Sequence, residues 1–129
     1  MIVVDASAVV EMLLDPAGAV RLRQRFLRAG EVLQAPHLID LEVLQVLRRY
    51  NFTGEMSDER AAEAISDFIA LPIERHSHAV VLDRVWELRS NLTAYEAAYV
   101  ALAELLGAHL VTTDKRLAKS APGVAELIQ

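Results

Sequence analysis

Two acidic residues stand directly behind apolar runs of the kind that form buried strands. Asp5 follows the run at 2–4, and Asp114 follows a similar run at 109–113. Short runs rich in β-branched residues favour a parallel sheet covered on both faces, and such sheets bind ligands at the carboxyl ends of their strands. Both acids also precede predicted helices, so capping of a helix start explains either one equally well when it is taken alone.

Two further acids lie on helix faces that are otherwise apolar. Glu42 and Glu96 each have apolar residues four positions before and four positions after them, so each shares a face that should point inward or toward a rim. A buried carboxylate is costly unless it is paired, protonated or bound to a metal ion. A structural partner remains open for both, and Arg48 or Arg49 is near enough in sequence to pair with Glu42.

The four acids together suggest one kind of chemistry. If they converge, their mutual repulsion favours protonation unless a cation lies between them. The chain has no cysteine and its four histidines show no ligand spacing, so hard carboxylate oxygens would select Mg²⁺ or Mn²⁺ rather than Zn²⁺. Such ions keep bound waters, and one of these can attack a phosphate. The pattern therefore favours metal-assisted hydrolysis of a phosphate ester.

The rest of the chain supplies elements that would bring these acids together. Strands and helices alternate, which predicts the α/β class, with a central parallel sheet of four to five strands and helices on both faces. The hydrophobic spacing and the turn residues predict strands at 2–4, 32–36, 72–75, 109–113 and 124–128. They predict helices at 6–14, 19–29, 38–50, 57–71, 79–89, 93–106 and 115–119.

Composition limits the classes of function. A chain of 129 residues with 53% hydrophobic residues can bury a core as one domain. The formal net charge of −5 argues against a general polyanion-binding surface, although a local basic rim could still meet phosphates. We find neither the pattern of a leader peptide nor an apolar run of membrane-spanning length, so we expect a cytoplasmic protein without a membrane partner.

Several other side chains have two explanations each. Three arginines fall at i, i+4 and i+7 and predict a basic helix face, either solvated or bound to RNA or an acidic partner: Arg21, Arg25 and Arg28. Three aromatic residues fit the core or a dimer contact better than platforms for base stacking: Trp86, Tyr95 and Tyr99. We assign all four histidines to the surface or to packing.

The order of these motifs resembles a known family. Asp5 with Ser7 after the first strand, the helix around Glu42, and the blocks at 92–103 and 110–117 are together similar to PIN-domain ribonucleases. The similarity is strongest to the VapC toxins of bacterial VapBC toxin–antitoxin pairs. It runs nearly end to end, so it implies a single PIN domain, residues 1–129. It implies a three-layer α/β/α fold, an endoribonuclease that depends on Mg²⁺ or Mn²⁺, and a target such as tRNA or another structured RNA. It also implies a homodimer whose VapB-like antitoxin wraps the toxin, in some cases as a higher hetero-oligomer.

The resemblance also assigns roles to individual residues. It makes Asp5, Glu42, Glu96 and Asp114 the acidic metal site. Polar support would come from Ser7 and Thr112, and contacts to RNA phosphates from Lys115, Arg116 and Lys119. This chain departs from the family twice, because the third acid is usually Asp, not Glu, and because many relatives carry another acid shortly after the fourth. The second departure makes a firmly bound second ion doubtful.

Two other functions stay open from the sequence. A PIN fold with a weakened site could act only as a module that binds RNA or protein. A Mg²⁺-dependent phosphatase or phospho-acceptor domain has a similar length and fold type, but Asp5-Ala6-Ser7 lacks the second Asp of an Asp-x-Asp phosphatase loop.

Overall fold

One parallel sheet forms the centre of the molecule. The computed structural model describes residues 1–129. Five strands pair in the order β3-β2-β1-β4-β5, all parallel. Their bounds are β1 (Ile2–Val4), β2 (Leu33–Pro36), β3 (Ile73–His76), β4 (His109–Thr112) and β5 (Ala125–Leu127). The predicted α/β/α arrangement with four to five parallel strands is therefore confirmed.

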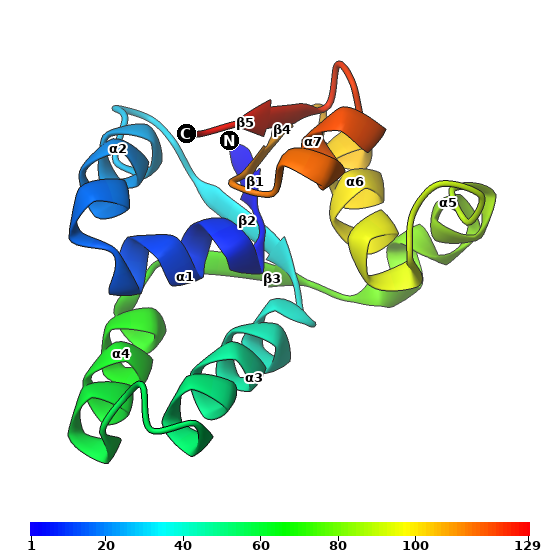
Figure 1. Ribbon diagram of the computed structural model, residues 1–129. Helices are drawn as coiled ribbons and strands as arrows, with labels where there is room; N and C mark the ends of the chain where they lie inside the picture. The colour runs from blue at the N-terminus through cyan, green and yellow to red at the C-terminus, as the bar shows by residue number, and fades with distance from the viewer.

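Helices cover both faces of this sheet. Figure 1 places α1 (Ala6–Leu14), α2 (Pro16–Phe26), α3 (Ile39–Phe52) and α4 (Asp58–Ala70) on one side. The other side carries the 3₁₀ helix η1 (His78–Val81), α5 (Leu82–Glu87), α6 (Ala94–Leu106) and α7 (Lys115–Ser120). No helix combines the length and the apolar character that crossing a membrane would require.

The order of the strands fixes where a ligand can bind. The chain leaves β1 toward β2 on one side, and β1 pairs on its other side with β4, which the chain reaches only after β3. The connections on the two sides of β1 therefore run over opposite faces, and this change of direction opens a crevice at the carboxyl ends of β1 and β4. Val4 pairs in register with Val111, so the residues that follow the two strands emerge side by side.

The buried position of the central helix α6 accounts for its alanine-rich sequence. It packs across β1, β2 and β4, and seven consecutive residues from Ala97 to Ala103 are buried. Small side chains let the helix approach the sheet closely around its circumference. Gly107 ends the helix in the left-handed conformation at φ +62°, which costs glycine little.

Local boundaries differ from the sequence prediction at two helices. The second helix begins at Pro16, three residues earlier than expected, because Asp15 caps it and proline suits the first helical turn. The predicted helix at 79–89 forms as a 3₁₀ turn followed by the short α5. The weak third strand is an edge strand with only Ile73 buried, which explains its poor hydrophobic pattern.

Candidate active site

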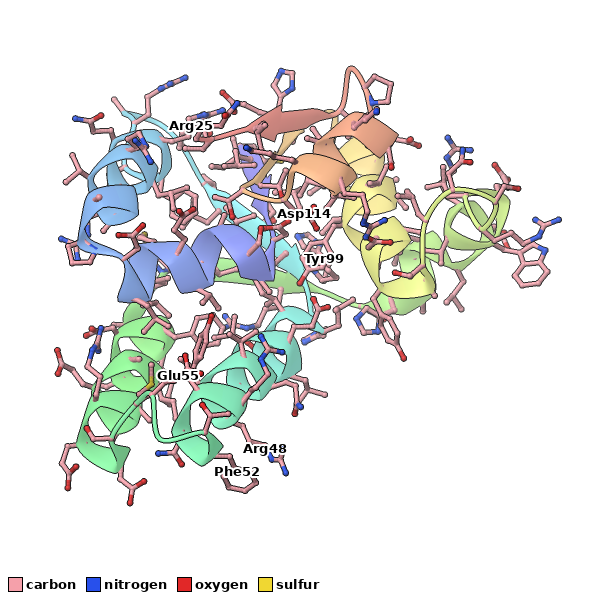
Figure 2. All side chains as sticks on the ribbon, viewed as in Figure 1. Arg25, Arg48, Phe52, Glu55, Tyr99 and Asp114 are labelled. Carbon is pink, nitrogen blue, oxygen red and sulfur yellow. The ribbon has the colours of Figure 1, made fainter.

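An acidic pocket opens at the carboxyl ends of β1 and β4. It encloses about 190 Å³ and brings together the four acids identified from the sequence; its lining residues are Asp5, Ala6, Ser7, Glu42, Glu96, Tyr99, Asp114 and Leu117. Figure 2 shows Tyr99 and Asp114 near the start of α1, where α3, α6 and the segment after β4 meet. Four separate elements thus contribute one carboxylate each.

Asp5 is the most buried and most firmly held of these acids, with 4% of its surface exposed. Its Oδ1 accepts hydrogen bonds from the Ser7 hydroxyl at 2.7 Å and from the Ala8 amide at 2.9 Å. Its Oδ2 accepts one from the Thr112 hydroxyl at 2.5 Å. Burial raises the pKa of Asp5 more than these donors lower it, and the charge of Asp114 raises it further.

Asp5 also caps α1, through the bond from the Ala8 amide. Capping, which the sequence offered as one explanation of Asp5, is therefore confirmed. Ser7 instead links the two strand ends, because its hydroxyl bonds Asp5, lies 3.2 Å from the Thr112 hydroxyl and accepts from the Thr113 amide. Capping and membership of the pocket are two roles of one side chain.

Glu42 is paired with a tyrosine rather than with an arginine. The buried Tyr99 hydroxyl donates to Glu42 Oε1 at 2.5 Å, and neither Arg48 nor Arg49 forms an ion pair with this acid. Burial raises the pKa of Glu42, the bond from Tyr99 lowers it, and the charges of Asp5 and Glu96 raise it. Tyr99, predicted from the sequence to lie in the core or at a dimer contact, is thus also a polar group of the pocket.

Glu96 lies at the rim and is held by its own helix start. The Thr93 hydroxyl accepts from the Glu96 amide at 3.1 Å, and Glu96 Oε1 accepts from the Thr93 amide at 2.9 Å, a complete capping box. Arg116 forms an ion pair with Glu96 Oε2. The sequence signal was present, since Thr93-x-x-Glu96 is the capping-box pattern.

Asp114 caps the third helix that starts at the pocket. Its Oδ1 accepts from the amides of Arg116 at 2.9 Å and Leu117 at 3.1 Å. The starts of α1, α6 and α7 therefore converge: Asp5 and Asp114 cap α1 and α7, and Glu96 belongs to the capping box of α6. The positive ends of α1 and α6 and their donated amides favour ionised carboxylates, which offsets part of the cost of gathering acids in one place.

The donor set suits a hard divalent cation. All four acids supply oxygen ligands, and the raised pKa values of Asp5 and Glu42 reflect burial together with negative neighbours, a combination that a cation would relieve. No three His, Cys, Asp or Glu side chains stand in an arrangement ready to hold an ion. Glu96 Oε2 forms an ion pair with Arg116 instead.

The basic residues proposed near the pocket all lie on α7. Lys115, Arg116 and Lys119 are exposed there, next to Asp114. Arg116 alone forms an ion pair with a pocket carboxylate, and neither lysine has an ion-pair partner. A positive rim therefore borders the negative pocket.

The predicted basic face of α2 is wrong at its middle residue. Arg25 is buried, with 7% of its surface exposed, and donates to Glu31 at 2.7 Å and to Glu126 at 2.8 Å. Glu31 also pairs with the amino terminus at 2.7 Å. Arg25 therefore links α2 to β5, apart from Asp114 of the pocket (Figure 2), and only Arg21 and Arg28 remain exposed.

Two of the three aromatic residues predicted for the core or a dimer contact lie outside the core. Tyr99 is buried, but Trp86 and Tyr95 each expose 67% of their surface, so neither belongs to the core. Exposure alone leaves the dimer contact as a prediction. The histidines lie at the surface or in packing, as His78 illustrates by accepting a hydrogen bond from the Leu38 amide at 3.0 Å.

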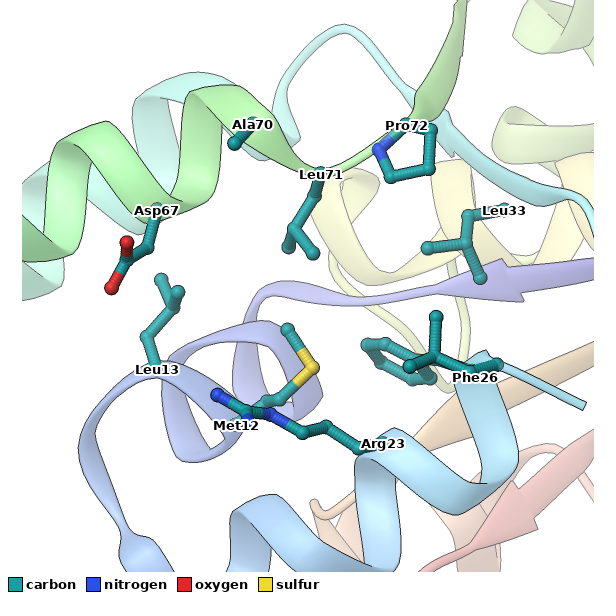
Figure 3. Close-up of a pocket in the computed structure, with 10 residues that line it drawn as sticks. Met12, Leu13, Arg23, Phe26, Leu33, Asp67, Ala70, Leu71 and Pro72 are labelled. Carbon is teal, nitrogen blue, oxygen red and sulfur yellow. The ribbon is translucent and has the colours of Figure 1, made fainter.

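A larger pocket lies elsewhere and differs in character. It encloses about 330 Å³ between α1, α2 and α4, and apolar side chains such as Met12, Phe26 and Leu71 form most of its wall. Figure 3 shows Arg23 and Asp67 at its edge. This pocket lacks the converging polar groups of a catalytic site, so its size does not make it the better candidate.

Comparison with known proteins gives consistent matches over nearly the whole chain. A family model described as PIN domain matches residues 2–121. Ribonuclease VapC12 of Mycobacterium tuberculosis is 42% identical over 128 residues, which cover 98% of this chain and 97% of that protein. VapC ribonuclease Mb0985 of Mycobacterium bovis is 42% identical over 117 residues, covering 91% and 88%.

Solved structures share the same fold. PAE2754 from Pyrobaculum aerophilum has a TM-score of 0.71 at 25% identity, covering 95% of this chain and 81% of that chain. VapC20 of Mycobacterium tuberculosis, described as a sarcin–ricin loop cleaving toxin, has a TM-score of 0.70 at 14% identity, covering both chains fully. A toxin–antitoxin complex from Klebsiella pneumoniae has a TM-score of 0.67 at 16% identity, covering 100% and 97%.

Proposed function

This chain belongs to the PIN-domain family and, within it, to the VapC ribonucleases; from that premise we propose that it is a toxin endoribonuclease that hydrolyses RNA phosphodiester bonds with Mg²⁺ or Mn²⁺. The observation that carries the proposal is the meeting of Asp5, Glu42, Glu96 and Asp114 in one pocket at the strand ends. Helix capping accounts for Asp5, Glu96 and Asp114 one at a time, but it accounts neither for Glu42 nor for the meeting of all four acids.

The carboxylates of the pocket would hold the ion in different ways, according to how many hydrogen bonds already fix them. When bound, the ion would supply an activated water and neutralise the charge that develops on the phosphate. Asp5 is the fixed ligand, because Ser7, Ala8 and Thr112 already orient both of its oxygens. Glu42 keeps Oε2 free of hydrogen bonds, as Asp114 keeps Oδ2, so both can turn an oxygen toward the ion.

Substrate binding would use the positive rim beside the pocket. We propose tRNA or another structured RNA as the target, with its phosphates held by the exposed cations of α7. Phosphate contacts from Lys and Arg supply affinity that depends on salt but not on sequence. Because the chain has a net charge of −5, this rim would be its main source of electrostatic attraction for RNA. RNA would then bind in one defined orientation, with its backbone along α7.

We also propose a cognate antitoxin partner and a homodimer. The VapC relatives and the likeness in fold to a toxin–antitoxin complex support the antitoxin. An exposed apolar patch around η1, α5 and the end of α6 supports the homodimer; it contains Val80, Leu82, Trp86 and Leu105. A dimer that carries its antitoxins would form a larger hetero-oligomer.

One observation favours a second function. Both oxygens of Glu96 are engaged by the chain itself, and no three acids are arranged to hold an ion. A PIN fold that has lost its metal site and serves only to bind RNA or protein would show the same arrangement. No observation of this kind favours the phosphatase or phospho-acceptor alternative.

Cleavage assays on conservative variants test the proposal. Purified protein freed of antitoxin should cut bulk tRNA or ribosomal RNA with Mg²⁺ or Mn²⁺ and stop in EDTA. Asp5→Asn and Asp114→Asn should lose this activity yet stay folded, because Asn caps helices as well as Asp does. Asp83→Asn is the matched control, because Asp83 is an exposed acid on α5 and lies outside the pocket. Wild-type cleavage by both pocket variants would overturn the assignment, and binding of RNA without any cleavage by the wild type would favour the binding module.

A further inference from the structure

The ion pair between Arg116 and Glu96 joins the positive rim to the acidic pocket. Only 15% of the Glu96 side chain is exposed, against 64% of the Arg116 side chain. Glu96 is also anchored from behind, since its Oε1 accepts from the Thr93 amide at 2.9 Å. The carboxylate is thus the fixed member of the pair, and the arginine reaches in from the solvent.

Hydrogen bonding leaves few pocket oxygens free in this state. Both oxygens of Asp5 accept hydrogen bonds, and so does one oxygen each of Asp114 and Glu42. Glu96 lines the pocket, and its Oε2 is paired with Arg116. The ion pair therefore occupies an oxygen that Glu96 could otherwise offer to an ion.

Arg116 can dissociate from Glu96 at low cost in free energy, and an RNA phosphate would be a stronger partner for it. An ion pair with an exposed arginine is weak, because solvent screens it and the long side chain loses freedom in forming it. A guanidinium also matches the geometry of phosphate oxygens, which it can bind through two parallel hydrogen bonds. The scissile phosphate would lie at the acidic pocket, next to the start of α7.

We propose that Arg116 is an exchangeable arm: it pairs with Glu96 in the free protein and transfers to an RNA phosphate when substrate binds. The transfer frees Glu96 to join Asp5, Glu42 and Asp114 as an ion ligand. The inference rests on the proposed function. The exchange should make cation binding and phosphate binding support each other. A cation that binds Glu96 releases Arg116 for a phosphate, and a phosphate that binds Arg116 releases Glu96 for the cation.

The proposal predicts opposite effects on two ligands. Arg116→Ala should bind Mn²⁺ about two- to fivefold more tightly in calorimetry without RNA, since it removes the cost of opening the pair. The same variant should bind bulk tRNA more weakly in EDTA and should raise KM in the cleavage assay. The salt dependence of its RNA affinity should fall by about one phosphate contact.

Lys119→Ala is the control for metal affinity, because it removes one positive charge from the same helix without touching a pocket acid. Tighter Mn²⁺ binding in Arg116→Ala but not in Lys119→Ala supports the exchange. Equal Mn²⁺ affinity in the two variants, or unchanged RNA affinity in Arg116→Ala, overturns it while leaving the ribonuclease assignment intact. A wild-type protein that neither binds Mn²⁺ nor cleaves RNA overturns both.

Discussion

The hydroxyl of Tyr99 offers a sharp test of how the pocket is built. It is buried and donates to Glu42 Oε1 at 2.5 Å, leaving Oε2 free. Tyr99→Phe removes only this hydroxyl. Hydrogen bonds to charged groups contribute about 1.5–3 kcal/mol, and the half-buried Glu42 can recover part of this from water. Taking the lower end, about 1.5 kcal/mol, we expect roughly a tenfold loss in kcat/KM and in affinity for Mn²⁺.

The same variant should shift the pH dependence in a defined direction. The bond from Tyr99 stabilises the ionised form of Glu42 and so lowers its pKa. Its loss raises that pKa above the value already raised by burial. Because the ion needs the ionised carboxylate, the acid limb of the kcat/KM profile should move to higher pH.

The assay combines cleavage rates from pH 5 to 9 with urea unfolding of each variant. Tyr50→Phe is the matched control, since the hydroxyl of Tyr50 makes no hydrogen bond with the chain. Unchanged kcat/KM and an unmoved acid limb in Tyr99→Phe would refute the positioning role. A loss of activity that only follows a loss of folded protein would refute it too.

Three further predictions concern stability and the rim. Arg25→Ala should lower the free energy of unfolding, measured by urea denaturation, by about 2 kcal/mol. This value lies between those for exposed and for buried ion pairs, because the two glutamate partners of Arg25 are partly exposed. In EDTA, the free energy of unfolding should fall as pH rises from about 4, because burial raises the pKa values of Asp5 and Glu42 in the folded protein above those in the unfolded chain. Asp5→Asn should show a shallower fall, because it removes one of these two groups. Glu96→Asp should tighten Mn²⁺ binding, because Asp is the usual third acid of the family and its shorter side chain would place the carboxylate where the other three acids expect it. Weaker binding in calorimetry would mean that the site is built around Glu.

Sequence reasoning was most successful where a residue's neighbours along the chain determine its environment. Asp5 and Asp114 could be placed at strand ends because apolar runs precede them directly. Glu42 could be placed toward the pocket because its helix face is otherwise apolar. Once the strand order follows the usual rules for parallel sheets, these positions must approach one another.

The partners of these acids depended on contacts between distant segments and could not be predicted in the same way. Glu42 lies 57 residues from Tyr99, and Arg25 lies 101 residues from Glu126. Helical spacing gave Arg25 the same face as two exposed arginines, but its ion pairs with Glu31 and Glu126 hold it in a buried position. Thr93 is different, because its capping box with Glu96 can be read locally and was missed.

Capping and membership of the acidic pocket need not be competing explanations of the acids, because the structure combines the two. Asp5, Glu96 and Asp114 each satisfy amides at the start of a helix while facing one pocket. The folding of three helices thereby fixes the positions of three carboxylates. A site built in this way is preorganised at little additional cost in side-chain freedom.

Calorimetric titration of Mn²⁺ into the wild-type protein and Asp5→Asn tests the metal site most directly. Our account predicts saturable binding to the wild type and its loss in Asp5→Asn, with circular dichroism showing that the variant keeps its helices. Equal binding by both proteins, or no binding by the wild type, would contradict the claim that these acids form a metal-dependent active site.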